Sequence, residues 1–196
     1  MVGLGTTVAA IIYDGVLRKG DTIVVGGLEK PIVTRVKALL MPKPLDEMRS
    51  PEDRFMHVDE VKAAAGVLVV AQGLEEAVAG APLVASAGEE ELGKLTREVQ
   101  EEVESVKIAR DVCGVVVKAD TLGTLEALVS YLRRHGVPVR YADIGPVVKR
   151  DVVEAMLVKN VDRLRAAILA FNVRVTEEAE VEAKMNGVRI FRSSII

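Results

Sequence analysis

The chain has 196 residues, of which 49% are apolar and 28% charged, and its formal net charge is −3 at pH 7. This composition is typical of a folded globular protein, and it excludes a strongly basic nucleic-acid-binding arm. One cysteine, Cys113, cannot form an internal disulfide, and no apolar run reaches the ~18 residues of a membrane span. The chain begins without the basic and apolar stretches of a signal peptide, so we expect a cytoplasmic protein.

Residues 1–87 predict a small antiparallel β-barrel. Short apolar runs rich in β-branched residues recur at close spacing, and glycines or prolines separate them. The predicted strands are Val8–Tyr13, Val16–Leu17, Thr22–Val25, Ile32–Leu40, Val67–Val70 and Pro82–Ala85. Residues 41–60 contain three prolines and many charges, so we expect this stretch to be an exposed loop.

Residues 88–112 predict a connecting helix with an acidic surface. Residues 89–112 carry eight acidic and four basic side chains, and the acidic ones at the start suit the positive end of a helix dipole. Apolar residues recur at three- and four-residue steps and form one narrow stripe: Leu92, Leu95, Val99, Val103 and Val106. Such a helix packs against one neighbour and leaves its acidic faces in water.

Residues 113–196 alternate between strand and helix patterns. The predicted strands are Gly114–Lys118, Val139–Ile144, Ile168–Val175 and Val188–Phe191. The predicted helices begin after Asp120 or Thr121, at Asp151 and after Thr176. This alternation predicts an α/β domain with a four-stranded parallel sheet flanked by helices.

No group of side chains predicts a catalytic site. Gly88 to Lys94 has the spacing of a phosphate-binding loop, but Leu95 stands where a Ser or Thr would hold Mg²⁺. Three glutamates within that loop would also repel phosphate. His57 and Glu60 lie far in sequence from any other His or Cys, so we expect no metal site there.

Two strand-to-helix connections remain as candidate binding sites. One contains Thr121 and Gly123, and the other contains the adjacent cations Lys149 and Arg150. Ligands bind at the carboxyl ends of parallel strands, and helix N-termini favour anions. A phosphate, an RNA backbone or an acidic protein surface are the candidate ligands. An ordinary capped loop and a solvated helix start are the plainer interpretations, and both stay open.

The sequence also resembles a known family. Residues 14–26, DGVLRKGDTIVVG, are similar to the strand–turn–strand signature in the second-domain barrel of translational GTPases. More specific runs are KADTLGTLEALVSYLRR (118–134), ADIGPVVKRDVVEA (142–155), ILAFNVRV (168–175) and GVRIFRSSII (187–196). Together they resemble domains two and three of the translation initiation factor 5B family, the archaeal and eukaryotic counterpart of bacterial initiation factor 2. The resemblance covers essentially the whole chain, and the proline-containing segment 41–60 favours the archaeal and eukaryotic branch.

The resemblance implies the ribosome-docking and signal-transmitting middle portion of a GTPase that promotes subunit joining with initiator tRNA in place. Its domain two would be residues 1–87, with the first barrel strand missing, followed by the connector helix 88–112 and domain three at 113–196. GTP and Mg²⁺ bind a G domain in that family, so we expect this chain to hold no cofactor and to be no enzyme by itself. The implied partners are rRNA and protein of the small ribosomal subunit, the G domain and a C-terminal barrel.

The family places domain two on the small subunit. Selected by charge and turn position, the cations expected to face rRNA are Arg18, Lys19, Lys30, Arg35 and Lys37. The expected contacts with neighbouring domains or RNA in domain three are Thr121, Gly123, Lys149 and Arg150. An anion- or nucleotide-sensing α/β module with an accessory barrel is the alternative from a different class. A piece of an elongation-type factor is a further alternative, disfavoured by the ending GVRIFRSSII.

Overall fold

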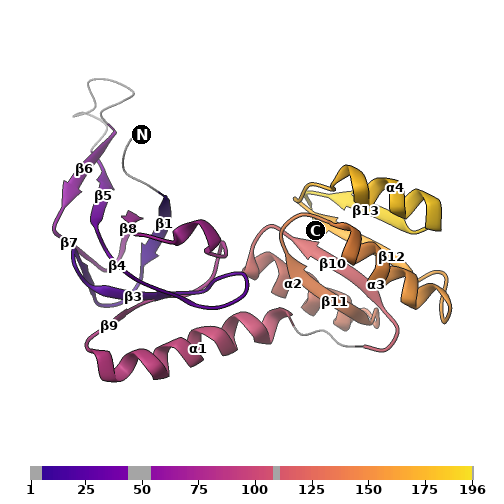
Figure 1. Cartoon of the computed structure of the whole chain (residues 1–196), viewed down its shortest axis with the longest axis horizontal. Coiled ribbons are helices and arrows are strands. Elements are labelled where there is room, and N and C mark those ends of the chain that lie inside the picture. Colours follow the sequence, from indigo (N-terminus) through magenta and orange to yellow (C-terminus); the bar gives the residue numbers. More distant parts are fainter. Residues whose placement is uncertain (1–5, 44–53, 108–110, 196) are drawn as a thin grey trace. The chain divides into compact units, whose positions relative to one another are not determined.

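The computed structural model describes residues 6–43, 54–107 and 111–195 (Figure 1). The chain forms two compact units. The first takes the residues up to Ala77 together with Ala81–Gln100, and the second takes Val78–Gly80 and the residues from Glu101 onward. The predicted connecting helix is α1 (Glu89–Lys107), and it contributes residues to both units.

The first unit consists of short antiparallel strands arranged as in a small barrel. Their hydrogen-bonded orders are β1-β8-β5-β6, β2-β7 and β4-β3-β9. The bounds are β1 Thr7–Ile12, β2 Val16–Arg18, β3 Thr22–Val25, β4 Ile32–Arg35, β5 Ala38–Pro42, β6 Phe55–Val58, β7 Glu60–Lys62, β8 Ala65–Val70 and β9 Leu83–Ser86. A single turn of 3-10 helix, η1 (Leu74–Glu76), precedes β9. The antiparallel fold predicted from the sequence is confirmed.

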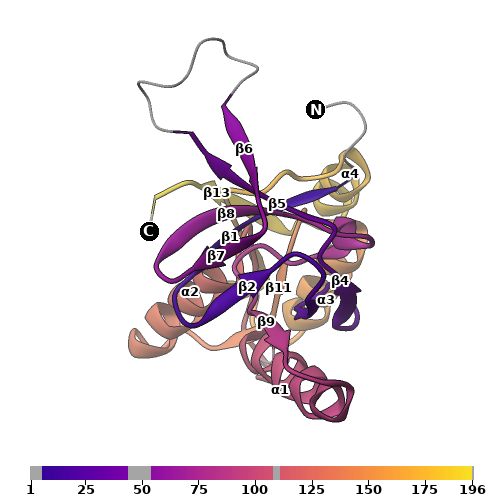
Figure 2. The ribbon, with the colours of Figure 1, turned by 90° about the vertical axis from the view of Figure 1, so that its left-hand side faces the viewer.

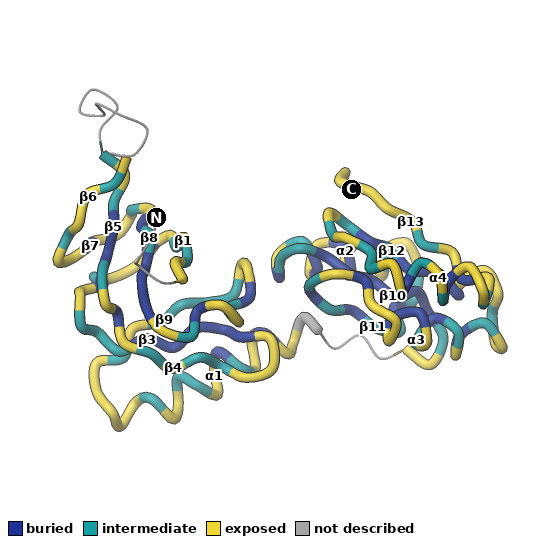
Figure 3. The backbone as a smooth tube through the Cα atoms, turned by 45° about the horizontal axis from the view of Figure 1, so that its top comes forward, coloured by how far each residue is buried: buried dark blue, intermediate teal, exposed yellow. Residues whose placement is uncertain are grey.

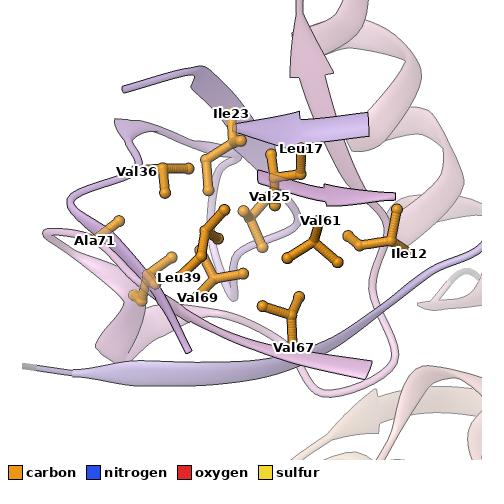
Figure 4. Close-up of a cluster of buried hydrophobic side chains, with 11 residues drawn as sticks. Ile12, Leu17, Ile23, Val25, Val36, Leu39, Val61, Val67, Val69 and Ala71 are labelled. Atoms are coloured by element: carbon orange, nitrogen blue, oxygen red, sulfur yellow. The ribbon is translucent and has the colours of Figure 1, made fainter. Parts of the chain in front are cut away.

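Aliphatic side chains from different strands fill the first unit. Ile23, Leu39 and Val69 have no exposed surface, and Figure 4 shows them converging with Val61 from β7. In β1 the exposure alternates from residue to residue, which is the pattern of a strand with one buried face. The tube in Figure 3 shows the same change from buried to exposed residues along the strands.

The predicted exposed loop at residues 41–60 is wrong in its described part. Residues 55–58 and 60–62 form β6 and β7, and β5 extends to Pro42. Met41 pairs with Met56 in an antiparallel register, and Val61 is a buried core residue. In β7 the exposed Glu60 and Lys62 flank the buried Val61, so strand character is hidden there behind a polar composition. Residues 44–53 lie outside the described part of the chain.

The helix α1 carries the predicted narrow apolar stripe. Val99 and Val103 are buried, Leu92 and Leu95 are half-buried, and the glutamates at its start are exposed. The side chain of Val106 lies outside the described part of the helix.

The second unit contains a four-stranded sheet in which every pairing is parallel, with strand order β11-β10-β12-β13. The bounds are β10 Val115–Ala119, α2 Leu122–Arg134, β11 Val139–Ile144, α3 Lys149–Lys159, β12 Ala167–Phe171, α4 Glu177–Asn186 and β13 Arg189–Ser193. All five residues of β10 are buried, as expected for a central strand. The α/β fold predicted from the sequence is confirmed.

Helices cover both faces of this sheet. Figure 2 shows α2 and α3 on opposite sides of β11, and α3 packs beside α4. The helix α2 begins at its predicted cap, where the Thr121 side chain accepts a hydrogen bond from Thr124 N. The strand β12 ends earlier than predicted because Asn172 adopts a left-handed φ of 52°. No helix among the described residues combines the length and apolar character that crossing a bilayer requires.

Candidate functional site

Three of the five cations selected in the barrel lie around one turn. The Gly20 N–H donates to the Val36 carbonyl at 2.9 Å, so the turn before β3 sits against the segment between β4 and β5. Lys19, Arg35 and Lys37 flank this contact, and all three are exposed. The Arg35 Nε donates to the Gly20 carbonyl at 2.6 Å, which holds its guanidinium against the turn. We call these three residues the basic turn.

The other two selected cations differ from the basic turn. Arg18 forms an ion pair with Glu60 at 3.5 Å, and Glu60 also pairs with Lys62. In an exposed pair of this kind, the carboxylate offsets the charge of the cation, and the pair contributes little to stability. Lys30 lies in the connection between β3 and β4, beyond the Val25–Ile32 pair and therefore at the opposite end of these strands from the basic turn. The structure thus brings together Lys19, Arg35 and Lys37 only.

In the second unit, the helix start at Thr121 already satisfies most of its own donors. Leu122 N donates to the Ala79 carbonyl at 3.0 Å, and Thr124 N donates to Thr121 Oγ1 at 3.2 Å. A side chain added at Gly123 would meet no atom within 4 Å. An anion here would therefore find the Gly123 N–H as the one donor of the first turn without a described partner, which gives the nucleotide-sensing alternative no support.

The two cations at the start of α3 also have partners. Lys149 Nζ lies 2.9 Å from Glu182 Oε2 on α4, and this hydrogen bond raises the pKa of Lys149. The Arg150 guanidinium lies over the Tyr141 ring, 5.8 Å from its centroid. Gly145 N donates to the Ala119 carbonyl at 2.9 Å, so the ends of β10 and β11 meet at one edge of the sheet.

Beneath that edge lies a buried ionic network that was not predicted from the sequence. Lys118 is only 3% exposed, and its Nζ lies 3.1 Å from Asp143 Oδ2 and 3.8 Å from Asp151 Oδ1. It also donates to the Ile144 carbonyl at 3.3 Å. The available signal was a lysine inside an apolar strand and an aspartate in the first turn of the helix after the next strand.

Burial controls the protonation of two groups in this network. Desolvation raises the pKa of Asp151, although the Val148 N–H and the Lys118 ammonium both oppose that rise. Burial, followed by the neighbouring Asp143 carboxylate, raises the pKa of Tyr141 to about 12. The Tyr141 hydroxyl donates to Asp143 Oδ2 at 3.1 Å, which stabilises its protonated form. The network therefore joins β10, β11 and α3 by charge and hydrogen bonding.

The described residues show no metal centre. Within residues 6–43, 54–107 and 111–195, no three acidic, histidine or cysteine side chains gather as a metal ion would require.

The barrel is of a kind found in translation factors. Residues 5–84 match the family described as elongation factor Tu domain 2. The structure is also similar to the crystal structure of GDP-bound aIF5B from Aeropyrum pernix, with a TM-score of 0.90 and 58% identity over all of this chain and 33% of that one. The matched class is thus that of translation factors.

Residues 88–196 match the family described as translation-initiation factor 2. The chain belongs to this family, which confirms the resemblance drawn from its motifs. Relatives named "Probable translation initiation factor IF-2" are 62% identical in Thermofilum pendens, over 99% of this chain, and 58% identical in Aeropyrum pernix, over 100%. The chain spans about a third (32%) of the length of each of these relatives.

Proposed function

We propose that this chain is the ribosome-docking and signal-transmitting middle portion of a cytoplasmic translation initiation GTPase. That factor promotes joining of the ribosomal subunits with initiator tRNA in place. GTP and Mg²⁺ belong to its G domain, which lies outside these 196 residues, so the chain itself hydrolyses no GTP. Its partners are rRNA and protein of the small subunit, together with the G domain and the C-terminal barrel of the same factor.

The observation that carries this proposal is the basic turn on a barrel of elongation factor Tu domain 2 type. The chain has a net charge of −3, so attraction to RNA must come from local groups of cations. Lys19, Arg35 and Lys37 form such a group, and no acidic partner is described for their side chains. The chain therefore docks with the basic turn against rRNA phosphates. Arg18 and Lys30 contribute less to RNA binding. Arg18 is paired with Glu60, and Lys30 lies at the opposite end of β3 and β4 from the basic turn.

The second unit transmits movement as a rigid body. The buried Lys118 network joins β10, β11 and α3, and helices pack on both faces of the sheet. Thr121, Gly123, Lys149 and Arg150 lie along the carboxyl edge of that sheet, where a neighbouring domain or RNA would meet them. A displacement applied at this edge moves the whole unit, since packed elements shift together.

Co-sedimentation of the chain with archaeal small ribosomal subunits over a salt series tests docking. We expect binding that weakens as salt rises, and that weakens at every salt when Lys19→Glu and Arg35→Glu are combined. The matched control combines Lys94→Glu and Arg97→Glu, which makes the same charge change on exposed positions of α1. Equal losses in the two double variants, or no binding even at low salt, would refute docking through the basic turn.

A further inference from the structure

Lys118 is a buried cation in an otherwise apolar strand, and its ammonium contacts both ends of the connection between β11 and α3. Its Nζ donates to the carbonyl of Ile144, the last residue of β11, at 3.3 Å. It also lies 3.8 Å from Oδ1 of Asp151 in the first turn of α3. A buried ion pair adds little net stability compared with well-packed apolar side chains. These directed contacts therefore indicate a role in fixing local geometry, beyond the free energy that they contribute to folding.

The connection spanned by that ammonium is also tied down along its backbone. Gly145 N donates to the Ala119 carbonyl at 2.9 Å, and Val147 N donates to the Arg174 carbonyl at 2.9 Å. Thr176 N in turn donates to the Val147 carbonyl at 3.0 Å. The backbone leading into α3 is therefore fixed against both the end of β10 and the connection that follows β12.

A second route leads from Lys118 to the side chain of Arg150. The Lys118 ammonium and the Tyr141 hydroxyl both donate to Asp143 Oδ2, each at 3.1 Å. The Tyr141 ring lies under the Arg150 guanidinium, 5.8 Å from the centroid of the ring. A guanidinium stacked on an aromatic ring can still donate from the N–H groups at its rim. Arg150 is exposed and forms no ion pair with the described residues, so these donors are available to a partner.

We propose that Lys118 is a positioning residue for Arg150. Its bond to Asp143 sets, through Tyr141, the orientation of the guanidinium, and its contacts at both ends of the connection set the backbone that carries Arg150. A side chain that is ordered before contact loses less conformational freedom when a partner binds. The contact assigned to Arg150 rests on the proposed function, whereas Lys118 is buried and acts only through its neighbours.

NMR spectroscopy of the full 196-residue chain tests this positioning. The observables are the ring-current shift of the Arg150 side-chain protons and the hydrogen exchange of the Gly145 and Val147 amides. In Lys118→Met we expect the ring-current shift to be lost, and the two amides to exchange about tenfold faster relative to the Val117 amide in the centre of β10. The Val117 amide reports opening of the whole sheet, so the ratio separates local release of the connection from a general loss of stability.

Two further variants complete the test. Lys118→Met removes the ammonium beside the buried Asp151 carboxylate, so a neutral triple variant covers the case in which it does not fold. Asp143→Asn and Asp151→Asn, added to Lys118→Met, remove the three charges of the network but keep side-chain oxygens as acceptors, and we expect the same two losses. The matched control, Lys159→Met, removes a lysine contact at the other end of α3, where Nζ donates to the Asn186 carbonyl, and changes neither observable.

Retention of the ring-current shift and of slow exchange in the neutral triple variant would overturn the proposal, because Lys118 would then only balance its own carboxylates. Equal acceleration of the Gly145, Val147 and Val117 amides would also overturn it, since the loss would be one of overall stability. These signals are measured without the ribosome, so a failure of docking and a failure of the positioning are observed separately.

Discussion

The basic turn of the first unit and the Lys118 network of the second use charge in opposite ways. Lys19, Arg35 and Lys37 stand in solvent, with the Arg35 guanidinium anchored to a backbone carbonyl. Lys118 is buried and is satisfied by two carboxylates and a carbonyl. In the sequence both regions read as cations beside turns or strand ends. The comparison teaches that burial, which sequence spacing does not reveal, decides whether a cation is available to a partner or holds the fold together.

We expect the largest loss of stability from a substitution of Lys118, which distinguishes the buried network from the basic turn. Lys118→Met removes the ammonium that faces the buried Asp151 carboxylate, and breaking a buried ion pair in this way costs about 3–5 kcal/mol of unfolding free energy. Guanidinium denaturation followed by circular dichroism measures the loss. Lys37→Met, an exposed control on the basic turn, changes stability by less than about 0.5 kcal/mol. Similar losses in the two variants would remove the distinction between buried and exposed cations.

The same variant has a defined dependence on pH. The pKa of Asp151 is higher in the folded chain than in the unfolded one, so the folded state takes up the proton first as the pH falls. Asp151 therefore favours folding more as the pH falls through the window between its two pKa values. Loss of Lys118 raises the folded pKa further, and the stability gap between the variant and the original chain narrows toward acid pH. A gap that widens on acidification would contradict this sign.

A second contrast appears at Tyr141, because burial and the neighbouring Asp143 carboxylate raise the pKa of its hydroxyl to about 12. Absorbance near 295 nm, with Tyr141→Phe subtracted, isolates its ionisation from that of Tyr13 and Tyr131. Asp143→Asn lowers the midpoint only in part, because burial is the larger cause and remains. Since the pKa is higher in the folded chain, the protonated tyrosine favours folding below its unfolded pKa, and that contribution is lost as the pH rises through 12. A midpoint near 10 in the folded original chain would show that the network is open to water.

A smaller effect is expected at the start of α2. Thr121→Ala removes the side-chain cap of Thr124 N and lowers stability by about 1 kcal/mol. Gly123→Ala, two residues along, meets no neighbouring atom and raises stability by about 0.5–1 kcal/mol, because alanine favours a helix. Thermal unfolding of the two variants measures the expected loss of stability in Thr121→Ala and the expected gain in Gly123→Ala. If Gly123→Ala destabilises instead, Gly123 is a packing position and not an open surface.

The smallest effect is expected at the surface pair beside the basic turn. A double-mutant cycle on Arg18→Ala and Glu60→Ala should give a coupling of about 0.2–1 kcal/mol, as for other exposed pairs. Urea denaturation at low and high salt measures the coupling, which decreases as salt screens it. A coupling of several kcal/mol would place Arg18 with the buried network and not with the surface.

Much of the fold could be predicted from local signals. The parallel sheet follows from alternating strand and helix patterns, and Thr121, Thr176 and Gly187 mark helix ends by their chemistry. The strands β6 and β7 could not be predicted in this way, because both are short and follow a polar segment that contains prolines. The candidate site was harder to predict. The contact between Lys118 and Asp143 depends on the register of β10 and β11. The separation of Lys30 from the basic turn depends on the register of β3 and β4. Residue spacing in the sequence encodes neither register.

The position of β13 at the end of the sheet order also affects how the chain behaves in concentrated solution. An edge strand presents unpaired backbone groups on which a second molecule could add a strand of its own. Arg189 and Arg192 stand on this strand, so two copies aligned edge to edge would bring like charges together. The short, charged edge therefore disfavours strand addition between copies, although no other element covers it.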